Sequence, residues 1–297
     1  MSKSTWTGDA IAGQLELIEN EIGKIRYAVA DRGNSIKKAL KTKGIYHVYD
    51  ITHGISLIVE HIYKRDTEFR EYTKRMAHLR GSQALGKMSH VLPPAQRSKA
   101  RFMNLRPVSD WGMSVLNVLE NAPDTLKAEK ENLNWVEGHK KIILELALLN
   151  KMINCIQLLL KTKGLSTGTL CECREVLKEA NTPGLQLFAK NLTGYLHHML
   201  SDRPMKDLNC LLCSSDIIES AFGKYKYYIH TNPMVGITNL SLTLAAFTGK
   251  LTMEEMTETF QSAKVDHVKN WTAKNIGQTT LSKRFAVFNW NEKEKSK

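Results

Sequence analysis

The chain has 297 residues, 42% of them hydrophobic and 24% charged, which is ordinary for a soluble globular protein. Its 42 Lys and Arg residues outnumber 30 Asp and Glu residues, giving a net charge of +12. This excess favours a polyanionic partner, nucleic acid before a membrane surface. No apolar run reaches the roughly 18 to 20 residues that span a bilayer, and the start lacks a signal-peptide pattern. Five cysteines, an odd number, predict reduced thiols and a cytoplasmic location.

The first part of the chain alternates helix and strand. Hydrophobic spacing and turn residues predict helices over 9–21, 35–41 and 55–64, and strands over 25–30 and 45–49. This alternation is expected of a parallel α/β sheet.

An aspartate follows each predicted strand, Asp31 after the first and Asp50 after the second. Functional sites of open α/β sheets assemble at the carboxyl ends of the strands, so both positions are favourable for a site. Each also has a purely structural interpretation. Asp31 stands in a turn sequence, Asp-Arg-Gly-Asn, and Asp50 can cap the helix that follows it.

The segment 64–106 is basic. Its first part, 67–81, is charged, and 81–106 is an irregular connection. The whole segment holds eleven Lys and Arg against three acids, so its net charge is +8, and it contains Pro93-Pro94. We predict that it contacts the DNA backbone, which carries no sequence information. The candidate DNA-binding residues are Arg97, Lys99, Arg101, Arg106 and, from a later segment, Lys224.

An all-helical block follows, with helices predicted over 108–120, 134–162, 170–180 and 183–200. The apolar stripe of the second of these helices indicates core packing. Trp111 and Trp135 are assigned to the core in preference to stacking on a nucleobase.

The next helix carries Glu219 and Lys226, seven residues apart. Seven residues are nearly two helical turns, so the two side chains share a face about 10 Å apart along the axis. Ser214 or Ser215 can cap this helix, and Asp216 lies in its first turn. Taken alone, the pair is typical of an ordinary helix surface; in a site, the carboxylate can hold a metal and the lysine a phosphate. An apolar segment over 237–247, a helix over 252–268 and a basic tail follow, with the last seven residues disordered.

Four cysteines have partial zinc-site spacing: Cys171 and Cys173, then Cys210 and Cys213. The second pair is a CxxC half-site, but CxC is less usual and the separation is long. Buried or incidental thiols are therefore favoured over zinc.

Four features follow one another in a fixed order along the chain. They are Ala30-Asp31-Arg32-Gly33 after one strand, Asp50-Ile51-Thr52-His53 after the next, a long helical insertion, and Glu219-x6-Lys226. In this order the chain resembles the bacterial insertion-sequence DDE transposases over roughly residues 5–250. These have a ribonuclease H-like catalytic domain. The resemblance implies that Asp31 and Glu219 are catalytic and ligate Mg²⁺ or Mn²⁺. Asp50, His53 and Lys226 then support the site. Leu212 and Ser215 replace a Tyr and an Arg of some related families, which leaves the exact family open.

The implied fold is α/β with a large all-α insertion, a partial ribonuclease H-like fold that is mostly helical overall. Its segments are a partial α/β core (1–63), a basic linker and helical insertion (64–209), a return to the core with the glutamate helix (210–268) and a basic tail (269–297). The first aspartate of the family precedes this set, so the chain is expected to be a C-terminal part and to be inactive or very weak alone.

The implied function is Mg²⁺-dependent DNA cleavage and strand transfer in transposition, with transposon-end DNA as partner and a homodimer allowed in a synaptic complex. Two alternatives remain open. The first is a catalytically inactive DNA-binding remnant of a transposase, and the second is a helical interaction module without a nucleic-acid role.

Overall fold

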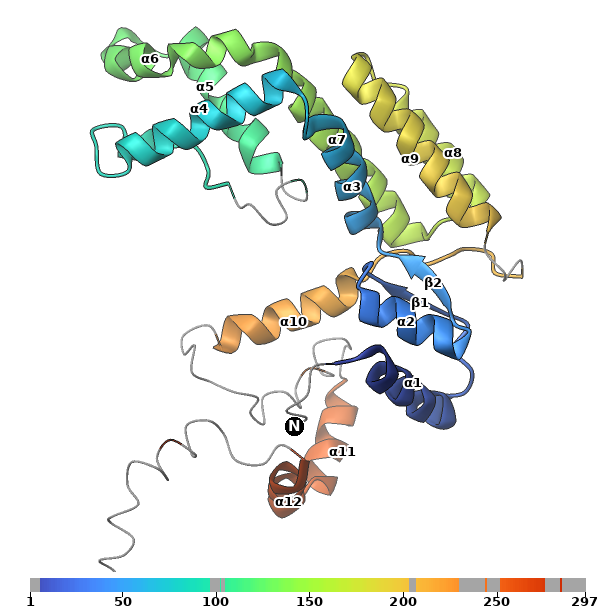
Figure 1. Cartoon of the computed structure of the whole chain (residues 1–297). Coiled ribbons are helices and arrows are strands. Elements are labelled where there is room, and N and C mark those ends of the chain that lie inside the picture. The colour runs from blue at the N-terminus through green and yellow to red at the C-terminus, as the bar shows by residue number, and fades with distance from the viewer. Residues whose placement is uncertain are drawn as a thin grey trace, which may run out of the picture. The chain divides into compact units, whose positions relative to one another are not determined.

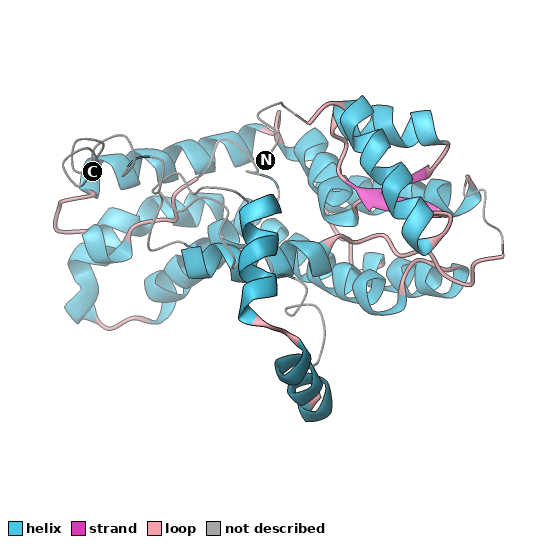
Figure 2. Ribbon diagram, turned by 90° about the horizontal axis from the view of Figure 1, so that it is seen from below, coloured by secondary structure: helices cyan, strands magenta, loops and turns pink. Residues whose placement is uncertain are grey.

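The computed structural model describes residues 6–96, 105–202, 207–229 and 252–275, together with positions 102, 244 and 284. It divides the chain into two compact units, Thr7–Ser214 and a smaller one formed by Met1–Trp6 and Ser215–Lys297. The described part is mostly helical with one small parallel sheet, which confirms the coarse fold class (Figure 2).

The larger unit begins with the predicted alternation of helix and strand. Helix α1 (Gly8–Ile22) is followed by β1 (Tyr27–Ala30), α2 (Asn34–Lys43) and β2 (Tyr46–Tyr49). The two strands pair in parallel, with Tyr27 opposite Tyr46 and Ala30 opposite Tyr49. Helix α2 ends at Gly44, whose φ of 66° is the left-handed conformation that glycine adopts without a steric cost. Helix α1 packs against α2.

Helix α3 (Ile51–Tyr63) starts four residues earlier than predicted. The reason is Asp50, whose side chain accepts hydrogen bonds from the first turn and lets the helix begin directly after β2. The capping interpretation of Asp50 is therefore confirmed.

The helical block continues the same unit. Its elements are α4 (Thr67–Gln83), η1 (Ser89–Val91), α5 (Arg106–Asn121), η3 (Asp124–Leu126), α6 (Lys127–Leu133), η4 (Asn134–His139), α7 (Lys140–Lys163), α8 (Thr167–Leu177) and α9 (Pro183–Ser201). Helix α7 contacts α3, α5, α8 and α9, and Figure 1 shows α8 and α9 as an adjacent pair beside it. The short helix α6 was not predicted, because its charged sequence lacks an apolar stripe.

One continuous core joins the sheet to this block. It runs from Val48 of β2 through the buried faces of α3, α4, α5, α7, α8 and α9 to Cys213. The segments 1–63 and 64–209, separate in the sequence prediction, therefore share their hydrophobic interior. Trp111 and Trp135 pack against this core, and the Trp111 indole nitrogen donates a hydrogen bond to the Val91 carbonyl at 3.0 Å.

The helical stretch Lys127–Lys163 is long and apolar enough to cross a bilayer by length and composition alone. Glu145 and Lys151 interrupt its apolar part, so it is not an uninterrupted apolar run. Within it, α7 buries Ile143, Leu146, Leu149 and Ile156 in the core. About 33% of the apolar window is buried, and this part contacts the surrounding helices.

The segment after α9 returns to the start of the block. Leu165 and Leu211, both fully buried, form an isolated antiparallel bridge with hydrogen bonds of 2.8 and 2.9 Å. The Ile51 backbone N–H donates to the Cys213 carbonyl at 2.8 Å. These bonds attach the segment to the connection between α7 and α8 and to the first turn of α3.

The smaller unit contains α10 (Asp216–Ile229), α11 (Met253–Ser262) and α12 (Val265–Asn275). The single helix predicted over 252–268 is wrong. The chain leaves the helical conformation at Ala263, with φ of −81° and ψ of 107°, and α12 starts again with Asp266 in its first turn, where the helix dipole favours a negative charge. The predicted segment 237–247 and the last seven residues lie outside the described residues.

Candidate functional site at the strand ends

The two predicted strand-end aspartates lie side by side in the larger unit. Asp31 follows Ala30 and Asp50 follows Tyr49, and these preceding residues are paired across the parallel strands. The Asp50 backbone N–H donates to the Ala30 carbonyl at 2.9 Å, which extends the ladder to the aspartate itself. The sequence argument about strand ends therefore places these two residues correctly.

The two carboxylates have different environments. Asp50 is only 1% exposed, and its Oδ1 accepts the backbone N–H groups of Thr52 and His53 at 2.9 and 3.1 Å. Such a buried carboxylate organises the start of α3. The adjacent His53 is half-buried. Asp50 thus fixes the first turn of α3, which carries His53.

Asp31 is exposed, and its Oδ1 accepts the Gly33 backbone N–H at 3.0 Å. This is the turn interaction that the sequence Asp-Arg-Gly-Asn indicates. The carboxylate is nevertheless open to solvent at the end of a parallel strand. It can therefore both form the turn and meet a ligand.

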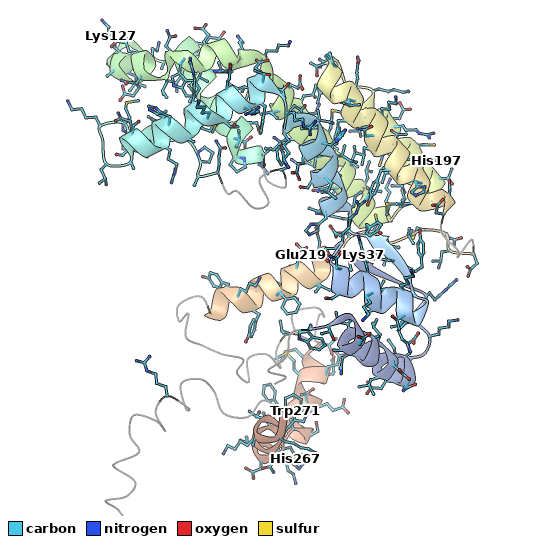
Figure 3. All side chains as sticks on the ribbon, viewed as in Figure 1. Lys37, Lys127, His197, Glu219, His267 and Trp271 are labelled. Atoms are coloured by element: carbon cyan, nitrogen blue, oxygen red, sulfur yellow. The ribbon has the colours of Figure 1, made fainter. Side chains whose placement is uncertain are left out.

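Cations and aromatic rings adjoin these strand ends. The Arg32 guanidinium lies 4.5 Å from the centre of the Tyr49 ring, and the Lys37 ammonium lies 5.8 Å from it. His47, two residues before Tyr49 and on the same strand face, packs against it with ring centres 4.5 Å apart. Figure 3 labels Lys37 on α2. We define Arg32, Lys37, His47 and Tyr49 as the strand-end basic patch.

This patch was not predicted from the sequence, although part of its signal is present there. Arg32 directly follows the candidate aspartate, and His47 and Tyr49 alternate along a strand. Sequence alone could not show that α2 brings Lys37 to the same ring. A cation over an aromatic face is an attractive contact that also leaves the charge available to an anion.

Two buried groups lie behind the strand ends. Burial raises the pKa of the Cys213 thiol to about 12, helped by the negative charge of Asp50. Burial also raises the pKa of the Tyr195 hydroxyl to about 12, against the opposing charge of Arg32. Tyr195 lies tightly against Gly54 of α3, where an added Cβ would be 2.7 Å from the hydroxyl oxygen. Both groups therefore stay neutral near pH 7.

Glu219 and Lys226 lie in the smaller unit, on α10, and both are exposed (Figure 3 labels Glu219). The Ser215 hydroxyl donates to Glu219 Oε1 at 3.4 Å, and the backbone N–H of Glu219 donates to the Ser215 carbonyl. Lys224 is exposed on the same helix. Asp31 and Asp50 share one unit, whereas Glu219, Lys224 and Lys226 belong to the other.

Of the predicted DNA-binding residues in the basic segment, Arg97, Lys99 and Arg101 lie outside the described residues. Arg106 begins α5, is exposed, and pairs with Asp110 at 3.2 Å. A surface pair of this kind contributes little to stability, so the arginine can exchange this partner for a phosphate at small cost.

Within the described part of the chain, no group of three or more His, Cys, Asp or Glu side chains is placed to hold a metal. Of the two aspartates, Asp50 has one carboxylate oxygen engaged in capping α3. The two cysteines of the CxC pair have different environments. Cys171 is exposed and Cys173 fully buried, since residues two apart point to opposite sides of a helix.

Comparison with known proteins does not assign the chain to a family. No family model matches the chain, and no curated protein matches it significantly.

Proposed function

We propose that this protein binds DNA and acts in transposition as part of a DDE transposase, with a ribonuclease H-like arrangement around β1 and β2. The proposal is supported by the net charge of +12 and by the basic segment 64–106, which contains eleven Lys and Arg residues but only three Asp and Glu residues. Surfaces of this charge bind the DNA backbone by releasing condensed counterions.

The observation that carries the proposal is the composition of the strand ends. An exposed carboxylate, Asp31, directly precedes Arg32, which shares the Tyr49 ring with Lys37. A phosphodiester substrate requires cations for its phosphate oxygens and carboxylates for a bound metal, and the carboxyl edge of a parallel sheet is where such groups collect. A purely structural ion pair would not require the Asp31 carboxylate to be exposed to solvent.

In this proposal Asp31 and Glu219 are the carboxylates that contribute to a Mg²⁺ or Mn²⁺ site. Lys224, Lys226 and Arg106 contact phosphates, and the buried Asp50 with His53 holds the start of α3 beside the site. A bound divalent cation would neutralise charge at the phosphodiester.

The first test is DNA binding as a function of salt. We expect the affinity for duplex DNA to fall steeply with salt concentration. Replacement of both Arg32 and Lys37 by Gln should make the slope of log affinity against log salt shallower, by the equivalent of roughly two phosphate contacts. Asp9→Asn, which alters an exposed carboxylate on α1, is the matched control and should not weaken binding. Absence of DNA binding even at low salt would refute the proposal and favour a helical interaction module.

The second test addresses strand cleavage. Any nicking of supercoiled DNA by this chain, which is expected to be very weak, should depend on Mg²⁺ or Mn²⁺. It should be lost in Asp31→Asn and Glu219→Gln but retained in Asp9→Asn. Full cleavage by Asp31→Asn or Glu219→Gln would rule out their catalytic assignment.

A second candidate function is catalytically inactive DNA binding. It is favoured by the hydrogen bonds that engage Asp31 in a turn and Asp50 in a cap. This alternative predicts salt-sensitive binding that is indifferent to Mg²⁺ and to Asp31→Asn. The two candidates therefore differ in the response to metal, while they share the response to salt.

A further inference from the structure

The hydroxyl of Tyr195 is a buried polar group that none of the roles proposed above uses. Tyr195 lies on α9, in the helical block, and its Oη atom is shielded from solvent without a hydrogen-bond partner among the described residues. Buried hydroxyls are nearly always hydrogen-bonded, because leaving one unpaired costs stability. A phenylalanine would fill the same space without this cost, so packing alone does not account for the hydroxyl.

The first turn of α3 brings this hydroxyl to the strand ends. An added Cβ on Gly54 would lie 2.7 Å from Tyr195 Oη and 2.8 Å from two of its ring carbons, so the ring packs here because α3 has a glycine. The Gly54 backbone N–H donates to the Asp50 carbonyl at 2.9 Å, and the Asp50 N–H donates to the Ala30 carbonyl. A side chain of the helical block therefore reaches the place where the chain leaves β1.

The guanidinium of Arg32 lies next to this hydroxyl. Burial raises the pKa of the Tyr195 hydroxyl to about 12, and the charge of Arg32 opposes this rise. A charge shifts a pKa in this way from within about 4 to 6 Å, so the guanidinium lies close to the hydroxyl oxygen. The same guanidinium lies 4.5 Å from the centre of the Tyr49 ring. Arg32 is therefore bordered by an aromatic face of the sheet and by a hydroxyl of the helical block.

The chemistry of arginine allows one edge of Arg32 to be held while another meets a ligand. A guanidinium carries five N–H donors in one plane. Arg32 is exposed, and none of the described carboxylates forms an ion pair with it. An oxygen that accepts one N–H at the inner edge fixes the plane of the group and leaves the outer edge for two oxygens of a phosphate. A side chain held in this way loses less rotamer freedom on binding than a free one.

We propose that Tyr195 is a positioning residue for DNA binding. Its hydroxyl accepts a hydrogen bond from Arg32 and holds the guanidinium over Tyr49, with the outer edge directed to a phosphate of the DNA backbone. This inference rests on the DNA-binding function proposed above. Tyr195 itself does not touch DNA, because its oxygen is shielded. The hydroxyl gains its partner when Arg32 binds a phosphate, so a residue of the helical block sets the geometry of the strand ends.

The test compares Tyr195→Phe with the wild-type full chain by fluorescence anisotropy on a labelled DNA duplex at low salt. We expect the affinity to fall by about threefold to tenfold, because one hydrogen bond to the bound arginine is lost. The urea midpoint of unfolding should stay the same or rise, because the removed hydroxyl has no partner in the free protein. In an Arg32→Gln background, the same substitution should have no further effect on binding.

Tyr72→Phe is the matched control. Tyr72 is also a buried tyrosine, on α4, but its hydroxyl donates to the Val108 carbonyl at 3.1 Å. Its replacement should lower the urea midpoint and leave the DNA affinity unchanged, which is the reverse of the result expected for Tyr195→Phe.

The outcomes separate this inference from the function on which it rests. Unchanged DNA affinity in Tyr195→Phe would overturn the positioning role and leave DNA binding intact. An equally large loss of affinity in the Arg32→Gln background would also overturn it, because Tyr195 would then act through another residue. A lowered urea midpoint in Tyr195→Phe would overturn it as well, since the hydroxyl would then have a structural partner. Absence of DNA binding by the wild-type chain at low salt would refute both proposals.

Discussion

The buried carboxylate of Asp50 offers a sharp test of how the strand ends are built. The side chain is 1% exposed and accepts two backbone N–H groups of α3, at 2.9 and 3.1 Å. Loss of an N-cap costs about 0.5 to 2 kcal/mol, and hydrogen bonds to a charged group are stronger than neutral ones. Because two such bonds are lost from a buried position, we expect Asp50→Ala to lower the free energy of unfolding by roughly 2 to 3 kcal/mol.

The assay is urea unfolding followed by far-ultraviolet circular dichroism. Two variants serve as references. Asp50→Asn keeps an oxygen acceptor, and Asn caps helices about as well as Asp, so it should cost less than about 1 kcal/mol. Asp66→Ala removes the half-buried cap of α4, which accepts a backbone bond from Phe69 at 2.7 Å, and should cost about 1 kcal/mol.

An Asp50→Ala variant no less stable than Asp66→Ala would refute the argument, because burial and the second hydrogen bond would then carry no energy. The same variants separate structural from catalytic roles. If Asp50 only positions α3, Asp50→Asn should retain any metal-dependent nicking that the wild-type chain has. Its loss in a fully stable Asp50→Asn variant would give Asp50 a direct part in the reaction.

Three further predictions concern buried polar groups. Burial and the charge of Arg75 lower the pKa of His139, so the unfolded chain takes up a proton near pH 6.5 while the folded chain does not. The free energy of unfolding should therefore fall as the pH drops below about 6.5. The fall should be smaller in His139→Phe. The Cys213 thiol, with its pKa raised to about 12, should react with a disulfide reagent at pH 8 far more slowly than the exposed Cys171. Tyr63→Phe removes the 2.6 Å hydrogen bond to Glu145 and should cost about 1 to 3 kcal/mol in urea unfolding.

Each of these has a result that would contradict it. An identical pH dependence in wild type and His139→Phe would mean that His139 is not held neutral. Equal labelling rates of the two cysteines in the folded chain would place Cys213 at the surface, whereas urea should make the rates similar in either case. An unchanged unfolding midpoint in Tyr63→Phe would show that the bond to Glu145 contributes nothing.

Most element positions could be predicted from the sequence, because their signals are local. The apolar spacing of 9–21 and the strands before Asp31 and Asp50 were recognised correctly, with boundaries a few residues off. Local chemistry also indicated the turn at Asp31 and the cap at Asp50, both of which involve backbone groups within three residues. The break at Ala263 was missed, because no residue type there forbids a continuous helix.

The candidate site was predictable only in part. Parallel pairing follows from the alternation of helix and strand, so the adjacency of the two aspartates could be expected. The exposure of Asp31 and the burial of Asp50 could not, because that difference depends on the packing of the unit. The positions of Arg32 and Lys37 over Tyr49 likewise require the orientation of α2.

By itself, the sequence determined the charge of the chain, its order of helices and strands, and the acids that follow the strands. Composition is a property of the whole chain and periodicity of residues close in sequence, so both can be read without knowledge of the fold. The tertiary structure alone decided that α7 is the central helix of the larger unit, that Leu211 pairs with Leu165, and that Tyr195 packs against Gly54. These features join residues far apart in the chain, and their contacts depend on how the helices pack together.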